Sequence, residues 1–267
     1  MKKKSARGKE NRAGLVICGS GLFPLRDLTV GAVKALAGCS AVFYVHRDYA
    51  RVALELKQLD SRIKLVPIFK GGRVDIGRLW GAIKKNLAAG RPTAYLTYGN
   101  PMLRGEGLEL SERCRAGAFE VSVLPGVSSI DVMHAAPGLL SQALGRGYTL
   151  ATAEDVATGR VVPHPRSTLV LMSAAEELDA GKFAALCKRL LGIFSPERSL
   201  FCVRMADPEN KSDITSWSLS DLPGLKKNIP HRATLVLPYF HSEDENRLER
   251  KRRRSAAAPA RNKYSPG

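Results

Sequence analysis

The sequence predicts an α/β protein of two domains. In its first half, short apolar runs alternate repeatedly with segments of helical periodicity, which is typical of a parallel sheet covered by helices. In its second half strands dominate, and one long helix over 180–194 has a clear apolar face. We therefore expect a mostly parallel sheet in the first domain and a mixed sheet in the second. The 267 residues, 44% of them hydrophobic, are enough for two cores.

The first domain opens with the apolar run GLVIC (14–18), which predicts a buried strand, and the turn GSG follows it. A helix is expected next, from Asp27 or Thr29, because the apolar residues of LTVGAVKALAGC form one stripe. The later elements alternate in the same way: a strand at 41–45, a helix in YARVALELKQL, a strand in IKLVPIF broken by Pro67, a helix in IGRLWGAIKKNLAAG, a strand in TAYLTY, a helix in LRGEGLELSERCRAG and a strand in FEVSVLPG.

The second domain differs after the segment PGVSSIDVMHAAPGL (125–139). Its expected strands surround the helix AGKFAALCKRLLGIF and comprise GYTLATAED, STLVLMSA (167–174), SLFCVRMA (199–206) and ATLVLPYF (233–240). We therefore place the domains at 14–124 and 125–240, between basic tails at 1–13 and 241–267. Blocks of like charge next to Ala, Pro and Gly predict that the second tail is disordered.

The net charge of +17 is concentrated in the tails. Residues 1–12 carry +5 and residues 241–267 carry +4, which leaves +8 on the body of the chain. A moderately basic body fits an anionic partner without requiring one. Any contact with nucleic acid would be confined to the basic tails.

Cysteine usage and hydropathy indicate a cytoplasmic protein. The five cysteines are scattered without a Cys-x-x-Cys pair, which favours reduced, packed thiols and predicts no metal site. The N-terminal segment lacks the apolar core of a secretory signal. No apolar run approaches the ~18 residues of a membrane span, so no membrane partner is expected.

Three turns of small residues follow expected strands of the first domain. They are GSG (19–21), GNP (99–101) and the Pro-Gly after Leu124. Glycine tolerates backbone angles that other residues avoid, and proline has no N–H to extend a ladder. Because ligands gather at the carboxyl ends of parallel strands, we expect the three turns to lie at one edge and to form a cleft.

A nicotinamide-binding interpretation fits this pattern poorly. The stretch GSGLFP has Gly19 and Gly21, but Pro24 stands where the third glycine of the dinucleotide fingerprint would pack. Asp48 is a weak match for the acidic residue that binds ribose. The sequence also lacks a Gly-x4-Gly-Lys-Ser/Thr phosphate loop.

The order of the motifs resembles the tetrapyrrole methylase superfamily of S-adenosylmethionine-dependent methyltransferases. The resemblance spans about residues 14–240 and is carried by the Gly-x-Gly strand end, DLTVGAVKAL, the VFY strand, YGNP, LPGVSS and the closing ATLVLP. Within the superfamily, YGNP followed by VLPGVSSIDVM is most similar to the methylase domain of borosins, which methylate backbone amides of a peptide. The resemblance implies a two-domain enzyme, usually a homodimer, that holds S-adenosylmethionine in a cleft between the domains.

The resemblance also implies which residues contact the methyl donor. Free backbone N–H groups and two hydroxyls in the PGVSS turn suit a carboxylate or a ribose, although Ser128 and Ser129 also suit a helix cap. Apolar strands would supply a dry slot for adenine. The implied donor-binding residues are Gly19 and Gly21 (indirectly), Tyr98, Asn100, Met102, Leu103, Ser128, Ser129, Met172, Val203, Ala233 and Thr234.

Two residues are catalytic candidates, Tyr98 and Arg73. In borosin methylases an arginine and a tyrosine precede the strand that ends in Tyr-Gly-x-Pro; here Arg73 lies one position off that register and no tyrosine is nearby. The family's turn histidine is Asn100 in this chain. The acceptor is therefore open between a peptide amide and a polycarboxylate corrin precursor, which would suit the basic body. A catalytically degenerate binding module with nucleic-acid-binding tails is the non-enzymatic alternative.

Overall fold

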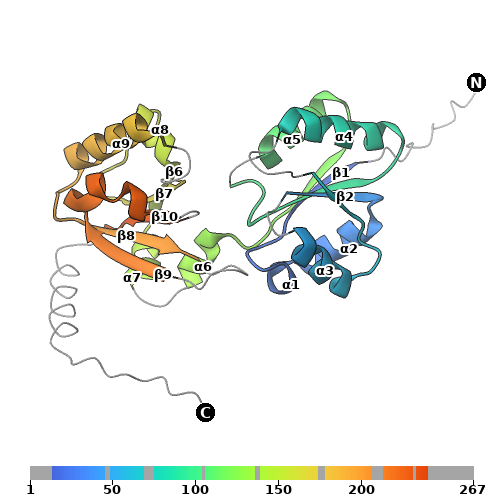
Figure 1. Ribbon diagram of the computed structural model, residues 1–267, viewed down its shortest axis with the longest axis horizontal. Coiled ribbons are helices and arrows are strands. Elements are labelled where there is room, and N and C mark those ends of the chain that lie inside the picture. Colours follow the sequence, from blue (N-terminus) through green and yellow to red (C-terminus); the bar gives the residue numbers. More distant parts are fainter. Residues whose placement is uncertain are drawn as a thin grey trace, which may run out of the picture. The chain divides into compact units, whose positions relative to one another are not determined.

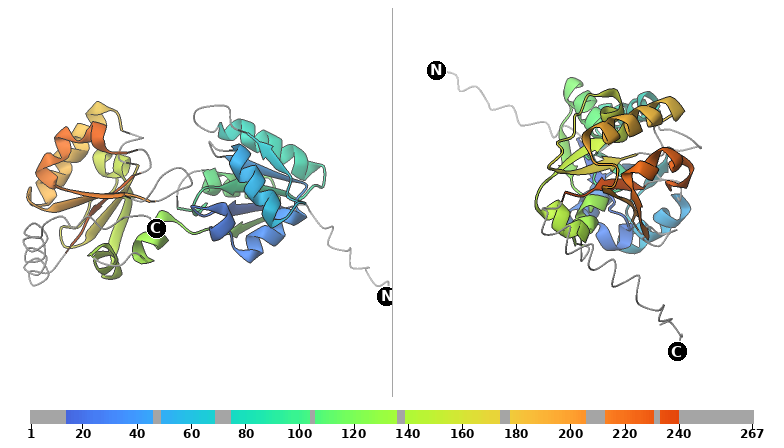
Figure 2. Two further views of the ribbon diagram at one scale, coloured as in Figure 1. Left: turned by 60° about the horizontal axis from the view of Figure 1, so that its bottom comes forward. Right: turned by 90° about the vertical axis from the view of Figure 1, so that its left-hand side faces the viewer.

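The computed structural model describes residues 14–45, 49–68, 75–103, 106–135, 139–173, 178–205, 213–230 and 233–239 (Figures 1 and 2). Contacts within the chain divide it into two compact units, and the boundary along the chain falls between Val132 and Met133, inside helix α6 (Ser129–Ala135). Each unit contains one five-stranded sheet. The expected α/β class, with a parallel first sheet and a mixed second sheet, is confirmed.

The first sheet has the strand order β3-β2-β4-β1-β5, and its strand pairs are parallel. Strands and helices alternate along this unit: β1 (Leu15–Gly19), α1 (Pro24–Asp27), α2 (Val30–Gly38), β2 (Ala41–Val45), α3 (Tyr49–Leu59), β3 (Leu65–Pro67), α4 (Ile76–Ala88), β4 (Thr93–Thr97), α5 (Glu106–Ala116) and β5 (Val121–Leu124). Pro67 ends β3 after three residues, so this strand is shorter than the apolar run suggested.

Helices cover both faces of the first sheet (Figure 1). Helices α4 and α5 bury Leu79, Ile83 and Leu110 against one face, and α2 and α3 bury Leu36 and Leu56 against the other. The strands are therefore buried on both sides, which explains why their sequences read as continuous apolar runs rather than alternating ones.

The second sheet has the strand order β6-β7-β10-β8-β9. Only β6 and β7 pair in parallel, and the other pairs are antiparallel. This unit contains α7 (Leu139–Gly145), β6 (Tyr148–Thr152), α8 (Ala153–Thr158), β7 (Thr168–Met172), α9 (Ala180–Ile193), β8 (Ser199–Arg204), β9 (Asp213–Ser218), the 3-10 helices η1 (Leu219–Gly224) and η2 (Lys226–Asn228), and β10 (Thr234–Leu237).

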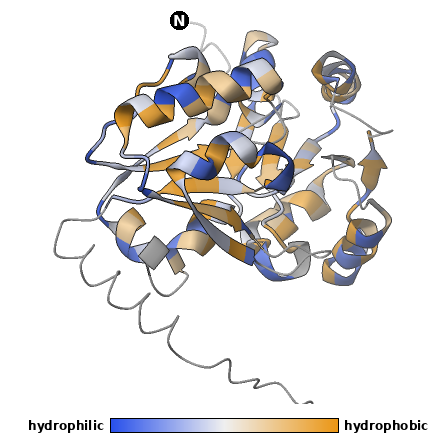
Figure 3. Cartoon of the chain, turned by 60° about the vertical axis from the view of Figure 1, so that its left-hand side comes forward, coloured by the Kyte–Doolittle hydropathy of each residue, from blue (hydrophilic) through white to orange (hydrophobic). Residues whose placement is uncertain are grey.

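The core of the second unit lies between its sheet and helices α8, α9 and η1. Leu171, Leu186 and Leu235 are buried in this cluster. Figure 3 shows strands that are mostly hydrophobic and helices that carry both hydrophobic and hydrophilic residues. Among the described residues, no helix is long and apolar enough to cross a membrane.

Candidate functional site

The three small-residue turns of the first unit meet at one edge of its sheet. Strand β1 lies between β4 and β5, and Gly19 pairs with Thr97 at the carboxyl end of the ladder. Beyond the strands, the Ser20 N–H donates to the Thr97 carbonyl at 2.7 Å. Gly21 and Gly99 form an antiparallel bridge in which the Gly99 N–H donates to the Gly21 carbonyl at 3.0 Å. The first two turns are thus joined by their backbones.

Three glycines allow these turns to pack in direct backbone contact. A Cβ on Gly19 would lie 2.2 Å from the Gly99 carbonyl oxygen and 2.7 Å from the Gly126 nitrogen. A Cβ on Gly126 would lie 2.5 Å from the same Gly99 oxygen. Gly99 has a φ of +68°, and the position of its own Cβ meets no atom within 4 Å. Gly19 and Gly126 therefore serve the packing of the turns, whereas Gly99, although buried, has space at its Cβ position.

Asp27 holds the first turn in shape. Its Oδ2 accepts hydrogen bonds from the Leu22 and Phe23 N–H groups, both at 2.9 Å. Burial favours the neutral carboxyl, but the hydrogen bond from Arg26 and those from the two backbone groups outweigh it, so the pKa of Asp27 lies below its usual value. Gly21 has a φ of +72°, and a Cβ there would lie 2.1 Å from the Asp27 Cβ. This role was not predicted from the sequence; the available signal was an acid two residues before Thr29, the N-cap of α2.

The turn after β4 is fixed by Asn100. Its Oδ1 accepts from the Met102 N–H at 3.0 Å, and its carbonyl accepts from the Leu103 N–H at 3.3 Å. Pro101 is buried against α5, where a Cβ on Gly107 would lie 2.2 Å from the Pro101 carbonyl oxygen. Half-buried Tyr98 begins this turn, and Met102 is exposed. The structure thus brings four predicted residues, Tyr98, Asn100, Met102 and Leu103, into one short turn.

Buried Tyr95 connects the strand before this turn to the helix after it. The Tyr95 hydroxyl donates to Glu106 Oε2 at 3.0 Å and so links β4 to the first residue of α5. Burial, and then the nearby Glu106 charge, raise the pKa of Tyr95. This contact ties the strand that leads into the turn to the helix that follows it in the chain.

Ser128 caps helix α6. Its N–H and its Oγ–H both donate to Asp131 Oδ2 at 2.7 Å, and the Asp131 N–H donates back to the Ser128 Oγ at 3.2 Å. This reciprocal pattern satisfies backbone donors in the first turn of a helix. Ser129 is the first residue of α6 and is partly exposed. The sequence left open whether Ser128 contacts the methyl donor or caps a helix, and the hydrogen bonds show that it caps α6.

Four predicted residues of the second unit lie at one edge of its sheet. Thr234 pairs with Val203, and Leu235 pairs with Leu171, which places Thr234 beside Met172 one residue further along. Because side chains alternate along a strand, Met172, Val203 and Thr234 share one face, and Ala233 lies on the other with the α8–α9 core.

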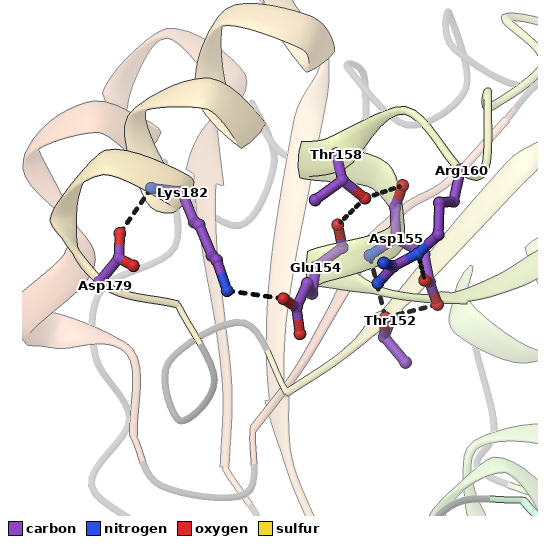
Figure 4. A network of polar contacts seen from close by, with 7 residues as sticks. All are labelled: Thr152, Glu154, Asp155, Thr158, Arg160, Asp179 and Lys182. Carbon is purple, nitrogen blue, oxygen red and sulfur yellow. Dashed lines mark hydrogen bonds and ion pairs between the residues drawn. The ribbon is translucent and has the colours of Figure 1, made fainter.

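A polar network borders this edge (Figure 4). Thr152 ends β6 beside Met172 and caps α8 by accepting from the Asp155 N–H at 3.0 Å. Lys182 of α9 donates to Glu154 of α8 at 2.6 Å, and this hydrogen bond lowers the pKa of Glu154. The network fixes the start of both helices next to the strand ends.

Two further polar residues, missed in the sequence, occupy the same edge. Ser173 follows Met172 with a φ of +60°, is 6% exposed, and its Oγ has no hydrogen-bond partner. Arg204 ends β8, and its Nε is likewise buried without a partner. Arg73, the second catalytic candidate, and both basic tails lie outside the described residues. Within those residues no cluster of three His, Cys, Asp or Glu side chains could hold a metal ion.

Comparison with known proteins decides the family. The family profile for Tetrapyrrole (Corrin/Porphyrin) Methylases matches residues 14–210. The chain belongs to the tetrapyrrole methylase family. This confirms the resemblance drawn from the sequence motifs, and with it the expectation of a family whose enzymes use S-adenosylmethionine as methyl donor.

One curated relative is a borosin precursor. It is the methyltransferase/ribosomally synthesized type III borosin cyclic peptide precursor aboMAa of Anomoporia bombycina, 25% identical. The match covers 84% of this tetrapyrrole methylase but only 28% of that relative, so the chain spans less than a third of its length.

Solved structures of tetrapyrrole methylases share the fold. Uroporphyrin-III-C-methyltransferase from Thermus thermophilus is 27% identical with a TM-score of 0.61, over 85% of this chain and 92% of that one. The methyltransferase CobJ is 18% identical with a TM-score of 0.65, over 85% and 94%. A Thermus thermophilus uroporphyrin-III C-methyl transferase complexed with S-adenosyl homocysteine has 21% identity and a TM-score of 0.61, over 85% and 92%.

Proposed function

We propose that the chain transfers a methyl group from S-adenosylmethionine to a backbone amide of a peptide. The observation that carries donor binding is the convergence of the GSG, GNP and Pro-Gly turns in backbone contact, with open space at Gly99. Family membership supports methyl transfer, and the similarity to a borosin precursor supports the peptide acceptor.

The residues at both strand edges fit a nucleoside donor. We assign donor contacts to the turn residues Tyr98, Asn100, Met102 and Leu103 and, in the second unit, to Met172, Val203, Ala233 and Thr234. Buried apolar strand ends suit a purine base, and the space at the Cβ position of Gly99 would admit a ligand group beside the backbone. Gly19, Gly21 and Ser128 act indirectly, because they shape the turns. Ser129 stays a candidate for direct contact.

The donor supplies an activated methyl group on a sulfonium. In the transfer, the acceptor atom forms the new bond to the methyl carbon while the carbon–sulfur bond breaks, S-adenosylhomocysteine leaves as a neutral thioether, and the proton of an amide acceptor passes to solvent. The protein contributes alignment of the acceptor and exclusion of water. We assign this alignment to Tyr98, which begins the turn fixed by Asn100. Arg73 remains a second candidate from the sequence.

A corrin or tetrapyrrole precursor is the second candidate acceptor. The 27% identity with uroporphyrin-III-C-methyltransferase over 92% of that chain favours it. The net positive charge of the body also suits a polycarboxylate. Carbon rather than nitrogen would then receive the methyl group.

Titration and turnover test this proposal in two steps. Isothermal titration of the full chain with S-adenosylhomocysteine is expected to show saturable binding; no heat and no thermal shift would refute donor binding. Mass spectrometry after incubation with S-adenosylmethionine and either a peptide or uroporphyrinogen III then identifies the acceptor. A gain of one methyl mass on uroporphyrinogen alone would replace the peptide proposal by the second candidate.

Removal of both basic tails tests the non-enzymatic alternative. The enzyme proposal expects the shortened chain to retain S-adenosylhomocysteine affinity. Salt-sensitive RNA binding that disappears with the tails, in a protein that binds no donor product, would instead support a binding module. A homodimer and a cytoplasmic location are further predictions, and light scattering and cell fractionation test them.

A further inference from the structure

We propose that Ser173 and Arg204 form a hydrogen-bonding pair that recognises the amino edge of the donor's adenine. This inference rests on the proposed function, because it assigns a ligand atom to two polar groups at the edge of the second sheet. It concerns residues that the sequence motifs did not single out.

In the protein without a ligand, Ser173 is expected to lower the stability of the fold. It adopts a left-handed backbone conformation, with a φ of +60°, that side-chain-bearing residues rarely occupy. Its hydroxyl is buried and has no hydrogen-bond partner. Glycine would remove both penalties, so a serine here indicates that the hydroxyl meets a group that the protein itself does not supply.

Arg204 presents a second unsatisfied donor at the same edge. It is the last residue of β8, and its Nε is buried without a partner. Strand β10 lies between β7 and β8, so one strand separates Ser173 from Arg204, roughly 10 Å from backbone to backbone. The Nε of an extended arginine side chain lies about halfway across that distance. Leu171 and Cys202, two residues before Ser173 and Arg204, both lie in the α8–α9 core cluster.

The pair matches the hydrogen-bonding pattern of adenine. Adenine presents an amino group that donates, and ring nitrogens beside it that accept. A serine hydroxyl can accept from the amine, whereas the arginine Nε–H can only donate, which suits a ring nitrogen. The proposed donor-binding residue Ala233, which precedes Thr234 and lies in the same α8–α9 core cluster as Leu171 and Cys202, is the apolar neighbour on the face of this pair.

The contact is tested by removing the Ser173 hydroxyl from the protein and the 6-amino group from the ligand, separately and together. The probes are S-adenosylhomocysteine and its analogue with hydrogen in place of the 6-amino group, titrated calorimetrically into the full chain. We expect the wild type to prefer the amine by about 3- to 10-fold, the worth of one ordinary hydrogen bond. In Ser173→Ala and Ser173→Gly this preference is expected to fall to about one. In Arg204→Lys, which keeps the charge but moves the donor, both probes should bind more weakly.

Stability separates recognition from a structural role. Ser173→Gly is expected to melt at a higher temperature than the wild type while binding S-adenosylhomocysteine about 3- to 10-fold more weakly. Ser111→Ala is the matched control, because Ser111 in α5 also has a buried hydroxyl without a partner. It should leave the affinity for both probes unchanged.

The outcomes are distinct. Ser173 variants that bind both probes as the wild type does would overturn this inference and leave the proposed function intact. Equal losses for both probes would show that the hydroxyl contacts another part of the donor, such as its carboxylate, and would also overturn it. A wild type that binds neither probe would remove the inference together with the proposed function.

Discussion

A methyl group on Gly19 would lie 2.2 Å from the carbonyl oxygen of Gly99, although these residues are 80 positions apart in the chain. Because the obstructing atom belongs to the backbone, Gly19→Ala can be accommodated only if the turns separate. We expect this variant to lose about 1–3 kcal/mol of unfolding free energy, the range for overpacked sites, measured by denaturant titration. Its S-adenosylhomocysteine affinity should fall as well.

The matched control is Gly81→Ala in helix α4, where an added Cβ meets nothing within 4 Å. Alanine favours helix, so this variant should gain about 0.5–1 kcal/mol. Equal stability of the two variants would show that the turns do not pack as described.

Asp27 gives the first unit a pH-dependent contribution to stability. Its folded pKa lies below the unfolded value of about 3.9, so its contribution is present above that pH and is lost as the pH falls through the folded pKa. Asp27→Asn should therefore be less stable than the wild type at pH 7, with a difference that shrinks near pH 3. Urea unfolding at both pH values measures it.

Asp75→Asn is the control for that experiment, because Asp75 caps α4 and asparagine caps a helix about as well. It should change stability little at pH 7. A deficit of Asp27→Asn that stays constant from pH 7 to pH 3 would contradict the assigned charge interaction.

The capping role of Ser128 predicts a side-chain-specific effect on stability. Ser128→Ala should cost about 1 kcal/mol, because the Asp131 N–H loses its partner, whereas Ser128→Asn should retain most of the stability. Thermal melting of both variants measures this difference. If alanine and asparagine were equally harmful, capping would not explain the serine. Ser129→Ala, outside the cap, should melt like the wild type.

All five cysteines should be unreactive in the folded protein. Each is buried, and burial raises the pKa of Cys18 to about 12 and that of Cys39 to about 11. The thiolate is the nucleophile, so at pH 8 almost none is available. Ellman's reagent should detect five thiols in denaturant and close to none without it. Rapid labelling of the native protein would contradict the buried positions.

The apolar pattern predicted most of the fold, because buried strands and helices have a recognisable hydrophobic periodicity in the sequence. The run GLVIC and the helix 180–194 are found close to where the sequence placed them. Strand β9 was missed because four of its six residues are exposed. Its polar residues are interrupted only by isolated apolar ones, so no apolar–polar alternation marks it as a strand. Helix α8 was missed because it follows β6 without an intervening loop.

The candidate site was only partly predictable. Turn residues such as Tyr98 and Asn100 could be named because Gly and Pro mark strand ends. The buried contacts of Asp27 and the unpaired hydroxyl of Ser173 depend on which segments meet in space, and a single sequence carries no such distances. Glycine is also ambiguous in a sequence: Gly19 is needed to pack against other backbone rather than to admit a ligand.

Strand β10, at Thr234–Leu237, pairs with β7 on one side and with β8 on the other. A growing polypeptide therefore cannot complete this sheet on the ribosome until nearly the whole second unit has been synthesised. Until then β7 and β8 each carry an open edge, and open edges invite pairing with other chains. Nascent chains that stall before Thr234 should thus be unusually dependent on chaperones.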